Sequence, residues 1–561
     1  MVDPLIDDLL GAHHARLSAR SGHEATWQRI NELIWPDGTP PWSGGGDGAA
    51  TRSEIYDNTA EDAADMASAA LHAMTTNPAT RWFELGLFDE QFARDTYAGA
   101  WLWRHTTKML RCFRHPSSRF NLAMDEDNKQ LIALGNSCLH VEPRAGKLPL
   151  YRAADMARVA WGENADGEVD IVGREFELTA RAAVQKWGND VPEEVWKMAQ
   201  SPGQAYDLVT FLHVNEPREE RDRSKRDRRN MAYRSTYLCV TYPAIVHDGG
   251  SHELEYVCSR WSRRANEIYG RGCGHKGLAD ADILQRMNRT ALLAGERTVD
   301  PPLLAPEDED MGPISLKARA INRVRPEYLS NGAHPRAMIT GTRVDIGLDL
   351  IVDRRELLRR SFLKQLIELS RDPKFTATQF VSLEAEAKRG LAPLLGRQQV
   401  ERLGPIVSRT FNILSRIPDV FDEAPPELQG MPLQPNFDSP DAKAMRLGVA
   451  RSIAQSFELL EPTIKATGDD ALWDNFDLDE GMRAQADGIG IPSAILRPLD
   501  VRDRMREQRL AVQRERDELE RFKDVTTGVK NAAPMAAVVA NLIKDAGGGA
   551  PAAAPAEAAA A

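Results

Sequence analysis

The chain has 561 residues and a formal net charge of −12. This length suits several lobes or one elongated subunit, and the negative charge excludes a surface that clamps nucleic acid over its whole extent. No run approaches about 18 consecutive apolar residues, and the first ten residues lack the basic start of a signal peptide. We therefore expect no membrane span. We also expect the protein to act in a cytosol or after release from one. The five cysteines form no C-x-x-C pair, which predicts reduced, mostly buried thiols.

Residues 1–135 are expected to be helical. Thr59 followed by Asp62 resembles a capping box, and alanine, leucine and methionine then recur at helical spacing. Asn77 and Pro78 end this helix, and a second long helix is predicted over 95–113. The pairs His13-His14 and His23-Glu24 lie in polar helical sequence, which predicts surface residues instead of metal ligands.

Residues 136–268 change to a β-rich pattern. Runs at 169–172, 208–214, 233–241 and 254–258 have strand composition and are separated by turn residues. His247-Asp248-Gly249-Gly250 is predicted to form a hairpin turn. Two short helices are expected, one from Thr179 and one from Pro192, and the charged tract 216–229 is interpreted as a solvated loop.

A glycine-rich turn then opens one helix over 269–299, and Pro301-Pro302 stops it. The insert at 300–350 shows strand periodicity at 314–320 and a second strand pattern at 337–346. A second helix is predicted over 353–371. Beside the first strand pattern lies an acidic patch of Glu307, Asp308, Glu309 and Asp310, which either meets a basic partner or is merely solvated.

Beyond this insert the pattern is again helical. A helical region over 378–417 is predicted to break at Pro393 and Pro405, and a proline-rich linker is predicted over 418–440. Helices are expected at 441–466, 478–488 and 498–523. Residues 524–561 have low complexity, which predicts a disordered tail.

The two helices that flank the insert share one design. On a helical wheel Ile283, Leu284, Met287, Ala291 and Ala294 form an apolar arc, and the second helix has a similar stripe. Such a pair predicts a stalk that carries a small β-rich tip; two ordinary surface helices are the alternative. On other sides of the two helices, or just after the second, lie the basic residues Arg286, Arg289, Arg360, Lys364, Arg371 and Lys374.

The segment Gly272–Gly277 matches G-x-G-x-x-G, a pattern of dinucleotide-binding loops. That reading needs a returning parallel strand after the helix, whereas Pro301-Pro302 and an acidic loop follow. Lys276 precedes glycine instead of serine or threonine, so no Walker loop exists. No pattern assembles a nucleophile, base and oxyanion site, and none predicts a metal or cofactor. The sequence therefore predicts a protein without catalytic activity.

Several motifs in order resemble the portal, or head-to-tail connector, proteins of short-tailed bacteriophages. The likeness spans about residues 20–520. It comprises the segments 71–78 and 81–85, then 134–137 and 174–176, the Tyr269-Gly270-Arg271-Gly272 turn, the Phe375-Thr376-Ala377-Thr378 segment, and the stretches 405–414 and 484–491. Cys273 stands where relatives usually have proline, and Gln379 stands where glutamate is commoner.

The resemblance implies an α+β fold, mainly α, in an elongated portal subunit. It implies an N-terminal helical wing part (1–135), a β-rich wing part (136–268), a first stem helix (269–299), a clip (300–350) and a second stem helix (351–372). A tunnel loop, wing helix and linker (373–440), a helical crown (441–523) and the low-complexity tail (524–561) would follow. Tyr269, Gly270, Arg271 and Gly272 would form the joint between wing and stem. The candidate tunnel loop is Phe375, Thr376, Ala377 and Thr378, for which a plain helix connector is the alternative.

The resemblance also implies the partners. A ring of about twelve copies would stand at one capsid vertex of the virion after assembly in the host cytoplasm. Double-stranded DNA would pass through its channel, without sequence preference. The candidates to face this channel or the neighbouring subunit are the basic residues Arg286, Arg289, Arg360, Lys364, Arg371 and Lys374. Other expected partners are the major capsid and scaffolding proteins, the terminase large subunit and the tail adaptor or nozzle proteins. The alternatives are a nucleotide-binding enzyme that uses Gly272–Gly277 and a non-viral assembly scaffold.

Overall fold

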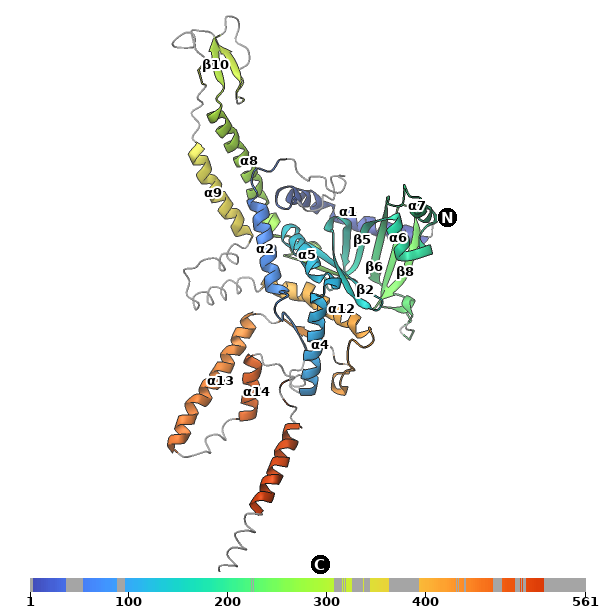
Figure 1. The fold of residues 1–561 in the computed structure, drawn as a ribbon. Coiled ribbons are helices and arrows are strands. Elements are labelled where there is room, and N and C mark those ends of the chain that lie inside the picture. The colour runs from blue at the N-terminus through green and yellow to red at the C-terminus, as the bar shows by residue number, and fades with distance from the viewer. Residues whose placement is uncertain are drawn as a thin grey trace, which may run out of the picture.

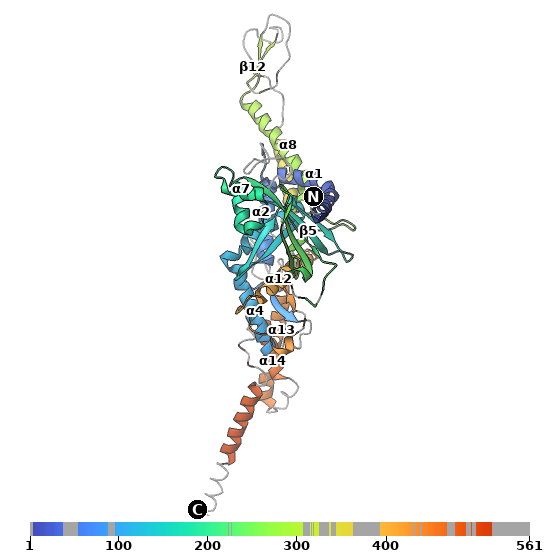
Figure 2. The ribbon, with the colours of Figure 1, turned by 90° about the vertical axis from the view of Figure 1, so that its right-hand side faces the viewer.

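The protein is elongated in both views of the computed structural model (Figures 1 and 2). A β-rich body lies in the middle, a two-helix stalk with a small sheet at its tip leaves one end, and further helices leave the other. Among the described segments, no helix combines the length and apolar character that crossing a membrane requires. The structure describes residues 4–36, 54–87, 96–222, 224–225, 227–306, 315, 317, 319–324, 336–337, 344–362, 393–429, 431, 433–437, 440–467, 477–489, 495, 497 and 501–518.

The N-terminal part is mainly helical, as predicted. Its elements are α1 (Pro4–Leu33), α2 (Thr59–Thr75), β1 (Glu84–Leu87), α4 (Thr96–Arg114) and α5 (Phe120–Leu134). The predicted capping box is wrong, because Thr59 is already the first residue of α2. Asp57 takes the capping role instead: its Oδ1 accepts a hydrogen bond from the Thr59 N–H at 2.9 Å.

Two antiparallel sheets form the β-rich body. The smaller has the order β3-β2-β9, and the larger has the order β4-β5-β6-β7-β8. Their strands are β2 (Asn136–Arg144), β3 (Lys147–Ala154), β4 (Val159–Glu163), β5 (Val169–Thr179), β6 (Leu208–Pro217), β7 (Tyr233–Cys239), β8 (Ala244–Ser251) and β9 (Tyr256–Arg260).

Alternation along β6 supplies both faces of the larger sheet. Val209 and Phe211 pack with α6 (Ala180–Trp187) and α7 (Glu193–Gln200) on one face. Leu212 and Val214 pack against Leu9 of α1 on the other face. Both short helices begin where the sequence predicts, and the Thr179 hydroxyl accepts a hydrogen bond from the Ala182 N–H.

The predicted turn at His247–Gly250 is wrong, because these residues lie inside β8. His247 stands opposite Tyr237, and Asp248 stands opposite Thr236. Glycine at this position instead allows another segment to pass close to the strand, because a Cβ on Gly250 would overlap the carbonyl oxygen of Arg228. Local sequence does not reveal such a crossing.

The stalk consists of α8 (Cys273–Val299) and α9 (Val344–Ser361), which lie side by side in Figure 1. Its tip is a three-stranded sheet of β10 (Leu303–Pro306), β11 (Ile321–Val324) and β12 (Arg336–Ala337), with β10 in the middle.

Both strand predictions for the insert miss the observed boundaries. A turn precedes Ile321, where β11 begins. The strand predicted over 337–346 overlaps β12 at Ala337, and it is wrong at 344–346 because Val344 already begins α9. The positions between, 338–343, lie outside the described residues. The β-branched residues at 344 and 346 favoured a strand. Tertiary packing stabilises a helix instead, because Ile351, Leu358 and Phe362 of the same segment enter the core beside α8.

A continuous helical run covers 393–415, so the predicted break at Pro405 is wrong. Residues Gln399–Leu403 form a π-helical turn before α12 (Gly404–Ser415), and the Gly404 N–H bonds to the Gln399 carbonyl. This wider turn lets the helix continue past a residue that has no N–H to donate.

The segment predicted as a linker packs on the body. Its strand β13 (Leu433–Asn436) pairs with β1, and Leu428 is buried in the core. Three helices follow, α13 (Pro440–Thr467), α14 (Leu478–Ile489) and one at 501–518, close to the predicted ranges. The predicted fold class, α+β and mainly α, is confirmed.

Candidate functional site

The predicted joint, Tyr269–Gly272, connects the β-rich body to the stalk. Its backbone lies directly against the end of α5. Gly135 has φ +80° and ends that helix, and a Cβ on Gly272 would lie 2.6 Å from the Gly135 nitrogen. A Cβ on Gly135 would in turn overlap the Gly272 nitrogen, so both positions require glycine, which also adopts the left-handed conformation at Gly135 without strain.

Side-chain hydrogen bonds hold the joint in this position. Asn136 Nδ2 donates to the Gly270 carbonyl at 3.0 Å, and Asn136 Oδ1 accepts from the Gly270 N–H at 2.6 Å. Arg271 and Ser262 form a second reciprocal pair, with both hydrogen bonds at 2.7 Å. Asn136, the first residue of the strand after α5, therefore pairs Gly270 backbone groups that would otherwise be buried without partners. Ser262 holds Arg271 from the loop after β9.

Tyr269 anchors the joint in the aromatic core. Its ring stacks on Trp161 with centroids 4.8 Å apart and meets the edge of Trp27 at 5.6 Å. Its hydroxyl accepts a hydrogen bond from the backbone N–H of Trp161 at 3.3 Å. Burial raises the pKa of Tyr269 to about 12, so the phenol stays neutral.

The G-x-G-x-x-G pattern is explained by packing. A Cβ on Gly274 would overlap the Ala133 carbonyl oxygen, and one on Gly277 would lie 2.8 Å from Phe362 Cε2. Protein atoms of α5 and α9 therefore occupy the places where a nucleotide would approach such glycines. These two glycines therefore have a role in packing.

His275 completes the start of α8. Its Nδ1 accepts a hydrogen bond from the Gly272 N–H at 3.3 Å, in the manner of a capping side chain. Burial, helped by the charge of Arg271, lowers the pKa of His275 to about 4. The ring is therefore neutral near pH 7 and Nδ1 is free to accept.

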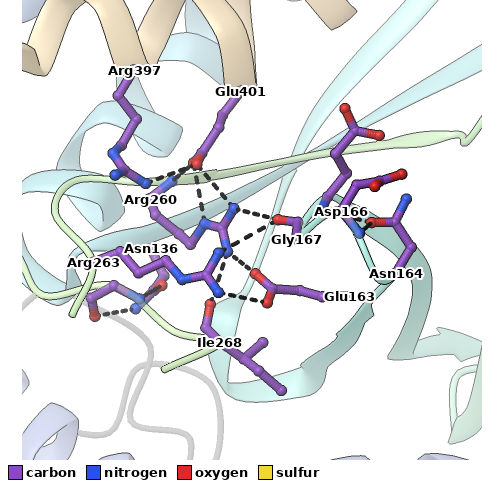
Figure 3. A network of polar contacts seen from close by, with 12 residues as sticks. Asn136, Glu163, Asn164, Asp166, Gly167, Arg260, Arg263, Ile268, Arg397 and Glu401 are labelled. Atoms are coloured by element: carbon purple, nitrogen blue, oxygen red, sulfur yellow. Dashed lines mark hydrogen bonds and ion pairs between the residues drawn. The ribbon is translucent and has the colours of Figure 1, made fainter. Parts of the chain in front are cut away.

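A buried polar network supports the joint from the side of β9 (Figure 3). Arg260 bonds to Glu163 and, at 2.9 Å, to Glu401 Oε1. Burial by itself would lower the pKa of Arg260, but the bonds to Glu401 and Glu163 outweigh it and raise that pKa. The network joins β9, the β4–β5 hairpin and the helix at 393–415, and its further members are Gly167, Arg263, Ile268 and Arg397.

Asp57 ties both stalk helices to the start of α2. Its Oδ2 accepts hydrogen bonds from Asn288 Nδ2 at 2.7 Å and from Arg355 Nε at 2.8 Å. Gln285 adds a bond to the Asp57 carbonyl at 2.6 Å. Burial opposes the charge of Asp57, but the bonds from Thr59 and Arg355 outweigh it and lower its pKa. Sequence reasoning missed this contact, since a lone aspartate before a helix indicates only a cap.

The basic candidates that the structure describes are exposed and already have neighbours. Arg286 pairs with Asp282 at 2.6 Å, and Arg360 pairs with Glu356 at 3.5 Å. Arg289 lies over the ring of Tyr56. Several predicted site residues lie outside the described residues, namely Lys364, Arg371, Lys374, Phe375, Thr376, Ala377, Thr378, Glu307, Asp308, Glu309 and Asp310.

The outer stalk exposes apolar side chains. The predicted apolar arc holds near the body, where Leu284 is buried and Met287 packs on the core, but Ile283 is 37% exposed. Farther out, Leu292 is 56% and Leu293 is 42% exposed. The exposed apolar side chains of the outer stalk also include Val299, Leu348, Leu350 and Val352.

Two smaller predictions have opposite outcomes. All five cysteines are buried and free, as expected. The prediction that His13 is a surface residue is wrong, because its side chain is fully buried with Nε2 3.2 Å from Glu175 Oε1. His14 is exposed, and His23 is half-buried against Trp27. His13 lies against Gly173 and Glu175 of β5, a contact that the polar local sequence hides.

Comparisons with known proteins give one family. A family model described as bacteriophage head to tail connecting protein matches residues 8–496. A probable portal protein of Bordetella phage BPP-1 is 28% identical over 80% of this chain and 81% of the relative. The portal protein of Salmonella phage epsilon15 is 22% identical over 87% and 88% of the two chains. A chain from the neck of an empty GTA particle covers 71% of this chain and 86% of that chain at 12% identity, but its TM-score of 0.31 is too low to bear on function.

Proposed function

Because this chain belongs to the bacteriophage head to tail connecting protein family, we propose that it works as a ring of about twelve copies at one capsid vertex. Its function is that of a phage portal protein. DNA would pass through the ring during packaging and ejection. The terminase large subunit would dock first and the tail adaptor or nozzle proteins later. This role is structural, and the proposal assigns no catalysis to the chain.

The exposed outer stalk is the observation that carries the ring. Leu292 and Leu293 on α8 and Leu348 and Leu350 on α9 leave apolar surface in water. Soluble monomers rarely expose contiguous apolar surface without a partner to cover it. In a ring, one face of each subunit packs on a different face of the next. The same contact, repeated around the ring, would therefore cover this apolar surface on every subunit.

The charges of the stalk suit a channel that passes DNA. Each phosphate that a protein neutralises adds salt-dependent affinity. Arg286 and Arg360 each have an acidic neighbour on their own helix. An overall charge of −12 adds no general attraction for DNA. This pattern supports passage of DNA in preference to tight binding.

Light scattering after size exclusion tests the ring. Copies of 62.3 kDa in a twelvefold ring would give roughly 0.75 MDa. Leu292→Ser with Leu293→Ser should weaken assembly while the helical circular dichroism stays unchanged. The matched control is Leu208→Ser, an exposed leucine at the start of β6. A wild-type chain that remains a monomer at micromolar concentration would overturn the proposal.

A binding assay tests the channel charges. Purified rings should bind double-stranded DNA no more tightly than about 1 µM at physiological salt. Arg286→Glu with Arg289→Glu should weaken even this binding and flatten its salt dependence. Saturable nanomolar binding to one DNA sequence would contradict a role in passing DNA without preference.

A further inference from the structure

Three potential metal ligands meet where the two sheets of the body join. They are His140 of β2, His213 of β6 and Glu255, which directly precedes β9. All three are buried, and their ligand atoms lie within 4.8 Å of one another. Two strands of the smaller sheet and one of the larger sheet therefore contribute to one cluster.

The distances within the cluster are too long for good hydrogen bonds. His140 Nε2 lies 3.5 Å from Glu255 Oε2, and His213 Nε2 lies 3.8 Å from the same oxygen. Hydrogen bonds between such atoms are normally about 2.7–3.2 Å long. Two ligand atoms on one tetrahedral zinc ion stand about 3.4 Å apart, given metal bonds of about 2.1 Å. The observed spacing therefore resembles that of atoms that share a metal.

His140 provides an independent observation that points to a ligand. Its side chain is 4% exposed, and among the described residues neither of its ring nitrogens has a hydrogen-bond partner. A buried polar group without a hydrogen-bond partner destabilises the folded protein. One face of the ring stacks on Tyr256 at 4.7 Å, which fixes its orientation while Nε2 points toward Glu255.

The other two ligands are held by neighbouring groups. His213 Nδ1 lies 2.6 Å from the Tyr256 hydroxyl, so Nδ1 can donate there. The Glu255 N–H donates to Asn215 Oδ1 at 2.7 Å. Metal-binding histidines usually donate their second ring N–H to a neighbouring polar group, as His213 Nδ1 can to the Tyr256 hydroxyl. Ser235 Oγ forms a hydrogen bond with His213 Nε2 at 2.9 Å, and an ion at Nε2 would replace this bond.

The residue types in the cluster indicate which kind of ion would bind there. With two imidazoles and a single carboxylate, the cluster suits a borderline-soft ion and lacks the oxygen ligands that calcium or magnesium needs.

We propose that His140, His213 and Glu255 bind one zinc ion that joins the two sheets of the body. The ion enters during folding, because the ligands come from three distant segments and are closed off from solvent afterwards. It stabilises the body by linking β2 and β6. This proposal is independent of the ring and of the DNA channel.

Metal analysis of the full chain tests the site. Protein expressed with added zinc and dialysed against a chelating resin should retain about one zinc per chain. His140→Gln and Glu255→Gln should each lose at least about tenfold in zinc affinity. The control is His105→Gln, which removes a buried histidine outside the cluster and should leave the zinc content unchanged.

Cobalt substitution keeps the test decisive if a ligand variant does not fold. Wild-type protein refolded with Co²⁺ should show the intense visible absorption of a tetrahedral site with nitrogen and oxygen ligands. Chelator should remove that absorption and lower the melting temperature. A wild-type chain without the absorption, or one whose zinc content equals that of a folded His140→Gln variant, would overturn the proposal.

Discussion

The two halves of α8 have the same sequence character but different surroundings. The half next to the body packs its backbone against α5 and its side chains against α9, with Gly274, Gly277 and Leu284 buried. The outer half exposes Leu292 and Leu293, and a Cβ on Gly295 would meet no atom within 4 Å. One helix thus contains a part that the chain itself stabilises and a part whose apolar surface is left for a partner.

This difference shows that a helical residue type has no fixed role. Glycine in the inner half makes close backbone contact possible, whereas Gly295 in the outer half only weakens the helix. Aspartate likewise differs: Asp57 is a buried acceptor for several donors, whereas Asp282 pairs at the surface. Four substitutions test this comparison, in order of decreasing expected effect.

Gly274→Ala should have the largest effect. The added methyl group would overlap the Ala133 carbonyl oxygen, and neither backbone segment can move freely. We expect the free energy of unfolding to fall by about 3 kcal/mol. Thermal melts followed by circular dichroism would measure it. An unchanged melting temperature would mean that α5 and α8 are not in backbone contact.

Asp57→Ala should have the next largest effect on stability. It leaves the Thr59 N–H, Asn288 and Arg355 without their acceptor at a buried position. We expect a loss of about 2 kcal/mol and faster hydrogen exchange in the inner halves of α8 and α9. The control, Asp282→Ala, removes a surface acceptor and should change stability by less than about 0.5 kcal/mol.

Acid should weaken the inner half through His275. The unfolded chain binds a proton on this residue near pH 6.5, whereas the folded chain binds it only near pH 4. Between these values the unfolded state carries more protons, so stability falls as the pH falls. His275→Gln should reduce this dependence between pH 6.5 and 4. A melting curve with the same pH dependence in both proteins would show that His275 does not titrate in this way.

Gly295→Ala should have the smallest effect and the opposite sign. Because nothing opposes the methyl group, it should stabilise α8 by about 0.5–1 kcal/mol. The same thermal melts measure it. Destabilisation of the isolated chain would indicate a contact of the outer stalk within the subunit and would blur the distinction between the two halves.

Local sequence predicts the elements of this protein well where one pattern dominates. Apolar spacing and Asn77-Pro78 place α2, the capping Thr179 places α6, and the glycine turn with Pro301-Pro302 delimits α8. These signals are local because helices and caps depend on residues a few positions apart. The family motifs along the chain are also visible in the sequence, and they predicted the family that the comparisons show.

Tertiary contacts decided what local patterns left ambiguous. Gly249-Gly250 resembles a turn but lies in a strand that another segment crosses, and Pro405 resembles a helix break but follows a wider turn. In each case a distant segment, or a change of helical pitch, alters the preferred conformation.

The polar clusters depend on the fold even more. His140, His213 and Glu255 share no spacing that a metal motif would show, and Asp57 meets Arg355 from a distant part of the chain. The sequence by itself determined the helices, the strand-rich region and the family. Only the folded chain decided which glycines touch backbone and which side chains meet, because those contacts join residues far apart in the sequence.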